Sequence, residues 1–181
     1  MANTSTYVST GKPQISGGVW VGPKTATVPT DATTSLGSDF KCLGFVSEDG
    51  VENANEMTTE TTKAWGGMIV YRPVTELNDT FALTLIESEN EDVLKTVYGT
   101  NNVTVSDGAI KVEVKAEDPE EHVFVFELAL RGGKKKRIVV PVGAVTGREA
   151  ITYNDSDAIG YGITISAYPD TDGNTHVEYI A

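Results

Sequence analysis

The chain has 181 residues, of which 39% are hydrophobic and 22% are charged, and 26 acidic against 14 basic residues give it a net charge of −12. This length suits one domain with a sizeable core, and the acidic charge argues against tight binding of nucleic acid, because carboxylates and phosphates repel each other. A single cysteine, Cys42, excludes an internal disulfide and offers no zinc-ligand spacing.

Residues 1–38 predict an extended, flexible N-terminal arm, and residues 39–181 predict a single domain. The arm is poor in aliphatic side chains and rich in Thr, Ser, Gly and Pro. The chain shows no secretory signal and no apolar run of the about 18 residues that span a membrane, so we expect a cytosolic origin. Two interpretations of the arm stay open: a disordered terminus, or an arm that packs on a neighbouring subunit with Trp20 as its anchor.

The segment 51–66 predicts a long polar loop that protrudes from the domain. It follows the turn signal Asp49-Gly50, it is rich in Thr and Glu, and it has almost no aliphatic residues. Its β-branched threonines favour an extended hairpin, which could bury little surface by itself. Such an excursion is more often an interaction loop than a packed element. We expect residues 68–71 to return to the core.

A strand followed by a short helix is predicted next. Residues 80–86 alternate between apolar and polar side chains, which is typical of a half-buried strand. The helix is expected at residues 88–98, with Ser88 as its N-cap, Glu91 completing a capping box and Gly99 after its end. Four apolar side chains form one stripe on this helix: Val93, Leu94, Val97 and Tyr98.

The rest of the chain predicts strands. Residues 122–130 form a long apolar run that is expected in the centre of a sheet. Further strands are expected at 103–105, 109–115, 138–142, 144–153, 158–168 and 175–180, with an acidic loop at 117–121. A total of about eight to ten strands with one short α-helix predicts a mainly β fold, a β-sandwich or barrel with the helix packed at an edge.

No group of residues predicts an enzyme, a metal site or a cofactor. The sequence has no Gly-x-Ser-x-Gly elbow and no phosphate-binding glycine loop. His122 and His176 stand alone at strand ends, without a second histidine at ligand spacing. Asp170, Asp172 and Asn174 resemble the start of a calcium loop, but no glutamate closes it, so a hairpin turn is expected instead.

The only basic cluster lies at residues 134–137. It has two interpretations: a solvated hairpin tip, or a patch that docks onto carboxylates of a second copy, from residues 117–121 or 48–60. The second interpretation predicts a head-to-tail contact, the kind that builds rings and stacks.

Taken in order, these features resemble the major tail proteins, or tail tube proteins, of long non-contractile-tailed bacteriophages (siphophages). The resemblance covers most of residues 39–180. Its most specific parts are Gly-Phe-Val-Ser-Glu-Asp-Gly-Val at 44–51, Lys-Ala-Trp-Gly-Gly at 63–67 and Thr-Leu-Ile-Glu at 84–87.

This resemblance implies a structural virion protein that forms hexameric rings, whose inner strands close one barrel and which stack into a tube for genome delivery. The loop and the arm would join neighbouring rings, and acidic charge would let double-stranded DNA pass without specific binding. The implied partners are further copies of the chain, a tape measure protein, a tail terminator and distal tail or baseplate proteins. The implied location is the virion tail, after synthesis in the cytoplasm of the host bacterium.

The candidate inter-subunit contacts come from the arm, the loop and the basic cluster: Trp20, Glu56, Thr59, Glu60, Lys63, Trp65, Lys134, Lys135, Lys136 and Arg137. Two alternatives remain at this point. One is the tube protein of a contractile injection system, and the other is a monomeric β-sandwich that binds a surface or a carbohydrate.

Overall fold

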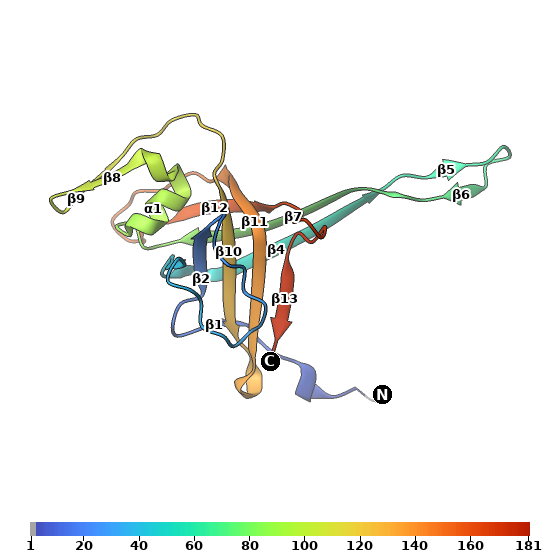
Figure 1. Ribbon diagram of the computed structural model, residues 1–181, viewed down its shortest axis with the longest axis horizontal. Helices are drawn as coiled ribbons and strands as arrows, with labels where there is room; N and C mark the ends of the chain where they lie inside the picture. The colour runs from blue at the N-terminus through green and yellow to red at the C-terminus, as the bar shows by residue number, and fades with distance from the viewer. Residues whose placement is uncertain (1–2) are drawn as a thin grey trace.

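The computed structural model describes residues 3–181 and shows a mainly β protein with one α-helix (Figure 1). This confirms the predicted fold class. The described residues contain thirteen strands rather than about eight to ten, because several strands are only two or three residues long. Within this part of the chain, no helix is long and apolar enough to cross a membrane.

Nine strands form one sheet: β1 (Lys12–Pro13), β2 (Val19–Pro23), β3 (Lys41–Cys42), β4 (Val46–Thr59), β7 (Val74–Leu85), β10 (Glu121–Ala129), β11 (Lys135–Arg148), β12 (Tyr161–Ala167) and β13 (Val177–Ile180). The remaining elements are β5 (Thr62–Lys63), β6 (Ile69–Tyr71), α1 (Glu91–Tyr98), β8 (Val103–Ser106), β9 (Ala109–Val112) and three 3-10 turns, Ser5–Tyr7, Thr100–Asn102 and Arg131–Gly133. The order in the sheet is β3–β2–β10–β11–β12–β7–β4, with β1 beside β10 and β13 beside β11.

The sheet bends at β11, so that its two halves face each other across a common core. The first half of β11 pairs with β13 and the second half pairs with β12, with a β-bulge before Gly147. At Gly143 a Cβ atom would come within 2.9 Å of the Phe124 ring, so the bend needs glycine there. Across the core, the rings of Phe81 and Phe126 stack with their centroids 4.9 Å apart. The two strands predicted at 138–142 and 144–153 are therefore one bent strand.

Strand β10 is buried on both faces, which confirms its predicted central place. Phe124 and Phe126 point into the main core, whereas Val123 and Val125 point to the outer face of the sheet. Burial of a side chain of this size stabilises the fold by about 1.5–3 kcal/mol. Both faces therefore need a cover, and the outer cover comes from the N-terminal part of the chain.

The arm predicted for residues 1–38 is wrong for residues 19–36, which belong to the domain. Strand β2 pairs with β10, and its Val19 and Val21 lie in the main core. The segment after β2 crosses the outer face of the sheet, where Ala26 and Leu36 pack against the second hydrophobic cluster. The flanking glycines suggested a loose segment, but the alternating valines carry enough apolar surface to join the sheet. Residues 1 and 2 lie outside the described residues.

Helix α1 packs on one end of the sandwich through the predicted stripe, since Val93, Leu94 and Val97 are buried. Its N-cap is Asn90, not Ser88, because the Asn90 side chain accepts a hydrogen bond from the Asp92 N–H at 3.0 Å. The Glu87 carboxylate orients that cap by accepting a bond from Asn90 Nδ2 at 2.9 Å. The helix therefore begins later than the predicted 88–98.

Candidate assembly surfaces

A long hairpin made of β4 and β7 projects from the body, with the small hairpin β5–β6 at its tip (Figure 1). Burial ends abruptly along β7: Phe81 is 0% exposed and Asp79 is 1% exposed, whereas Leu77 is 46% exposed. All of residues 55–78 are exposed except Ala64 and Pro73. We call residues 55–78 the projecting hairpin. They form a protruding element that differs in its bounds from the predicted 51–66.

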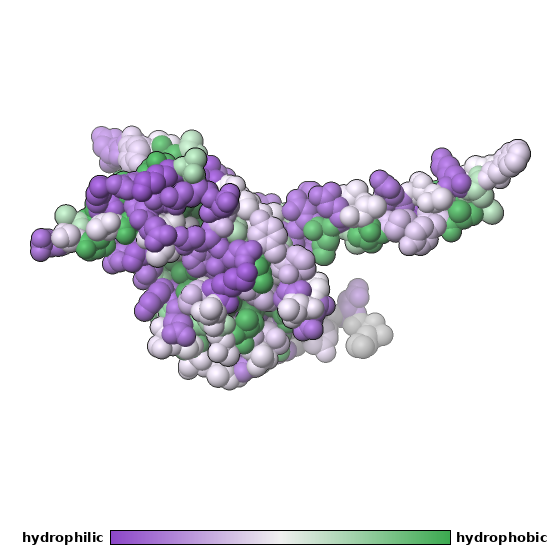
Figure 2. Space-filling view, turned by 45° about the horizontal axis from the view of Figure 1, so that its top comes forward, coloured by the Kyte–Doolittle hydropathy of each residue, from purple (hydrophilic) through white to green (hydrophobic). Residues whose placement is uncertain are grey.

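One face of the projecting hairpin is apolar. Met57 and Leu77 are paired across β4 and β7 and lie on the same face as the core residues Phe81 and Leu83. Towards the tip, the exposed large hydrophobic residues are Trp65, Met68, Ile69, Val70, Tyr71 and Val74. Figure 2 shows hydrophobic side chains along one side of this projection. An exposed apolar face of this extent marks an interaction site.

The expectation that residues 68–71 return to the core is wrong, because all four are exposed on the projecting hairpin. Their apolar composition is that of a core strand, but their partner strand belongs to the polar loop. The predicted contact residues of the loop all lie on the projecting hairpin. All five are exposed: Glu56, Thr59, Glu60, Lys63 and Trp65. Their role in subunit contacts stays a prediction.

The opposite face of the same strands carries small and acidic side chains. On β7 and β12 it consists of small residues, and along β4 and β7 it continues into glutamates: Thr80, Ala82, Thr84, Gly162, Thr164, Ser166, Glu52, Glu56 and Glu76. Glu149 lies over Gly162, where an added Cβ atom would clash with its carboxylate. Within residues 3–181, none of these side chains belongs to either hydrophobic cluster. We call this surface the Thr/Glu face.

Two strand edges next to these faces are free within the described residues. Strand β4 pairs only with β7 along its fourteen residues. The second free edge lies on β11, at the other end of the strand series β4–β7–β12–β11. There β10 stops pairing with β11 at Ala144, whereas β11 continues to Arg148. Free edges of this kind are templates for pairing with another chain.

The basic cluster at 134–137 separates into two parts. Lys134 and Lys135 are exposed at the β10–β11 turn, and Lys136 forms an ion pair with Glu178 of the same chain at 2.7 Å. Arg137, in contrast, is only 3% exposed. The prediction that all four side chains form an exposed docking patch is therefore wrong for Arg137.

Arg137 holds the N-terminal segment onto the sheet. Its guanidinium pairs with Glu127 and donates hydrogen bonds to the carbonyl oxygens of Asp31 at 2.8 Å and Thr34 at 2.9 Å. Trp20 is also used within the chain, because it packs against the outer hydrophobic cluster and its Nε1 donates to the Gly17 carbonyl at 3.2 Å. Sequence reasoning missed both roles, since it treated the N-terminal segment as separate from the domain.

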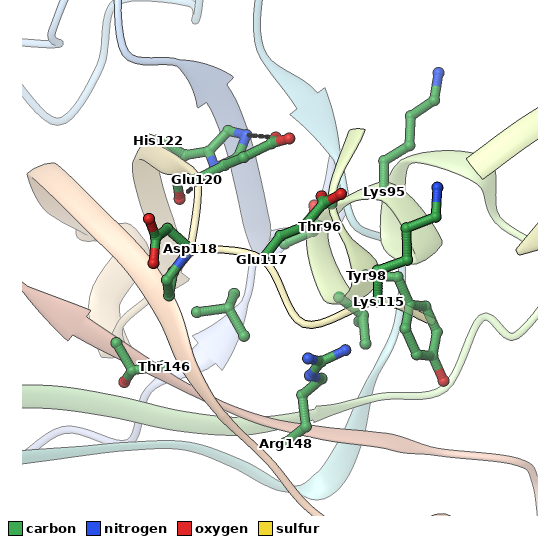
Figure 3. A pocket seen from close by; sticks show the side chains of 14 residues that line it. Lys95, Thr96, Tyr98, Lys115, Glu117, Asp118, Glu120, His122, Thr146 and Arg148 are labelled. Atoms are coloured by element: carbon green, nitrogen blue, oxygen red, sulfur yellow. Dashed lines mark hydrogen bonds and ion pairs between the residues drawn. The ribbon is translucent and has the colours of Figure 1, made fainter. Parts of the chain in front are cut away.

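A hollow of about 210 Å³ lies between the end of α1, the acidic loop at 117–120 and the free edge of β11 (Figure 3). Its walls carry three cations, Lys95, Lys115 and Arg148, and three carboxylates. Most of these groups have partners: Glu120 accepts a bond from the Thr100 hydroxyl at 2.7 Å, and Arg148 lies 5.6 Å from the Tyr98 ring centre. The hollow therefore offers a polar surface beside a strand edge.

The other residues singled out in the sequence have local partners. Asp170 Oδ1 accepts bonds from the N–H groups of Asp172 and Asn174, as expected for a turn. The imidazole Nδ1 of His122 lies 3.2 Å from the Glu120 carbonyl oxygen. In the part of the chain that the structure describes, no three His, Cys, Asp or Glu side chains gather as metal ligands.

Comparison with known proteins adds a family to this geometry. Residues 2–181, nearly the whole chain, match the family model described as phage tail tube protein. No curated protein matches the sequence.

Proposed function

Because the chain belongs to the phage tail tube protein family, we propose that it forms hexameric rings that stack into the tail tube, through which the genome passes into the host. The observation that carries this proposal is the contrast between the two faces of β4 and β7. One face is apolar and is not covered by any other part of the described chain. The other face carries small and acidic side chains, which are stable in contact with water.

Ring closure joins the two free strand edges. Strands β11, β12, β7 and β4 are antiparallel neighbours, so β4 runs opposite to β11 within one subunit. In a ring, every subunit has the same orientation along the axis. The β4 strand of one subunit therefore meets the free β11 edge of the next in antiparallel orientation, and the four strands continue as one sheet. This pairing also removes the exposed edges.

The Thr/Glu face then lines the channel. Its side chains are short, so they leave the bore open, and its glutamates repel the phosphates of DNA. A passing duplex meets no basic side chain among the residues named for this face. The surface therefore supports movement of DNA without specific binding.

Stacking uses the projecting hairpin. Its apolar face, with Met57 and Leu77, packs on a subunit of the adjacent ring and loses its contact with water. The predicted contact residues Glu56, Thr59, Glu60, Lys63 and Trp65 lie on the same hairpin and are candidates for this contact, and the exposed Lys134 and Lys135 are candidates to pair with its glutamates.

In the virion, the tube meets a tape measure protein, a tail terminator and distal tail or baseplate proteins. The chain is made in the cytoplasm of the host bacterium and ends in the virion tail. Its role is structural rather than enzymatic, and it needs no cofactor.

Negative-stain electron microscopy of the purified protein, with light scattering on a sizing column, tests this proposal. We expect hollow rings or tubes with sixfold images in end view, either spontaneously or after addition of a tail-tip complex as nucleus. A protein that stays monomeric at high concentration with that nucleus present would overturn the proposal.

A further inference from the structure

A buried carboxylate marks the root of the projecting hairpin. Asp79 is 1% exposed, although every residue from 74 to 78 on the same strand is exposed. Its register partner on β4 is Asn55, the first residue of the projecting hairpin, and its partner on β12 is Ala167. A buried charge is costly unless other groups hydrogen-bond to it, so this position needs an explanation.

Three side chains from two other segments bind this carboxylate. Asn53 Nδ2, on β4, donates to one oxygen at 2.8 Å. The Thr175 hydroxyl donates to the other oxygen at 2.7 Å, and His176 Nδ1 lies 2.5 Å from it. We call Asn53, Asp79, Thr175 and His176 the Asp79 cluster.

The cluster joins the hairpin root to the C-terminal part of the chain. Thr175 and His176 directly precede β13, which pairs with β11. The His176 ring also meets the Phe81 ring edge-on, with centroids 5.4 Å apart. Phe81 in turn stacks on Phe126 in the core. The root is therefore fixed to both the C-terminal segment and the core.

The direction of the hairpin is sensitive to this root. An isolated two-stranded ribbon is soft and twists easily. A strand of about 12 residues spans roughly 40 Å, so a tilt of about 10° at the root moves the tip by roughly 7 Å. That displacement exceeds the reach of a side-chain contact.

We propose that Asp79 and His176 are positioning residues for assembly, which fix the direction in which the projecting hairpin leaves the body. This inference rests on the proposed function, because it assumes that the hairpin docks on a second copy. The bond between Asp79 and His176 orients the hairpin before that copy arrives, and so lowers the entropy lost on docking.

Protonation of Asp79 at low pH should weaken the hydrogen bonds of the Asp79 cluster. Burial by itself raises the pKa of Asp79, but the hydrogen bonds from Thr175, His176 and Asn53 and the charge of His176 outweigh it, so the pKa is lowered. A lowered pKa means that the carboxylate stabilises the fold above its ordinary pKa of about 3.9, and that this contribution is lost as the pH falls below that value. His176 is the only titratable group among the hydrogen-bonding side chains, and Asn55 and Ala167 on the neighbouring strands are uncharged.

A matched pair of substitutions tests the proposal. His176→Leu removes the donor, whereas His176→Asn places an amide Nδ2 close to the position of Nδ1. We expect hydrogen exchange of residues 74–79 and 168–176 to rise about tenfold or more in His176→Leu, as loss of a charged hydrogen bond predicts. In His176→Leu, exchange in the core strand β12 should stay unchanged and seeded tube growth should slow by about tenfold. In His176→Asn, the exchange rate at the root and the rate of tube growth should both stay within about twofold of the wild type.

Asp79→Asn provides the pH signature. The wild type should keep its protection at the hairpin root from pH 7 to about pH 4 and lose it as the pH falls further, after correction for the intrinsic exchange rate. Asp79→Asn should show the fast exchange already at pH 7 and change little on acidification. The Asp79→Asn experiment also serves in place of His176→Leu if that variant does not fold.

The outcomes separate the two proposals. Wild-type tubes together with normal root exchange and normal growth in His176→Leu would overturn the positioning role. Equal loss of protection at the root and in β12 would overturn it too, because it would show a general structural role. A wild type that never assembles would overturn the proposed function, and the exchange measurements would still decide whether the cluster holds the root.

Discussion

The two halves of β7 both carry apolar side chains on one face but have different surroundings. From Phe81 to Leu85, alternate apolar residues fill the core of their own subunit, whereas Leu77 and Val74, before Asp79, lie exposed to water. The inner half alternates strictly between apolar and polar residues, whereas in the outer half a register shift between Thr58 and Thr59 places Val74 and Leu77 on the same face. The inner half covers its own core, and the outer half has no cover within the described chain. In the proposed tube, a subunit of the adjacent ring covers this outer half.

The largest expected effect is on assembly. Replacing Met57 and Leu77 by threonine should abolish tube formation, because it removes the paired apolar side chains of the projecting hairpin. The free energy of unfolding of the monomer should change by no more than about 0.5 kcal/mol, since both sites are exposed. Light scattering and urea unfolding measure the two quantities separately.

The matched control changes two neighbouring residues on the opposite face of β7, Glu76→Thr with Asn78→Thr. This variant should keep the apolar face and still form tubes. Loss of tubes in the control alone would reverse the assignment of the two faces.

The same strand should respond differently inside the body. Phe81→Ala should lower the free energy of unfolding by about 3–5 kcal/mol, because it leaves a cavity where the ring stacks on Phe126. Urea unfolding of the monomer measures this loss. A change below about 1 kcal/mol would mean that the core does not depend on the inner half of β7.

Arg137 offers a third comparison, between neighbouring basic residues. Arg137→Met should cost about 3 kcal/mol of stability, because it leaves the Glu127 carboxylate and the carbonyls of Asp31 and Thr34 without their donor. Lys135→Met, two residues away and exposed, should stay within about 0.5 kcal/mol. Equal costs in thermal unfolding would contradict the buried role of Arg137.

The smallest expected effect concerns the helix cap. Asn90→Ala should cost about 1 kcal/mol, because it removes the acceptor of the Asp92 N–H. Ser88→Ala should cost much less, since Ser88 lies before the cap. If chemical denaturation showed a larger loss of stability for Ser88→Ala than for Asn90→Ala, the capping box predicted from the sequence would be correct.

Much of the body could be predicted from local patterns. The alternation at 80–86, the central strand at 122–130 and the apolar stripe of the helix all depend on periodicity, which burial directly imposes. The cap shifted from Ser88 to Asn90 because two polar residues compete for the same position and only the side-chain geometry decides.

The remaining wrong or missed predictions share one cause: they depend on which distant part of the chain packs on a given segment. Val19 and Val21 were expected in a separate arm, yet they are paired with a strand about a hundred positions later in the sequence. Residues 68–71 were expected in the core because they are apolar, but they lie outside it. The Asp79 cluster has no sequence motif, since its members come from three distant segments.

Thiol accessibility in assembled tubes tests the central claim most directly. In a Cys42→Ala background, one variant carries Ala54→Cys on the Thr/Glu face and another carries Leu77→Cys on the apolar face. A small maleimide should label both thiols in the monomer; in tubes it should still label the first, while the second becomes protected. Protection at position 54 with free reaction at position 77 would contradict the assignment of an open, acidic channel face and a covered, apolar docking face.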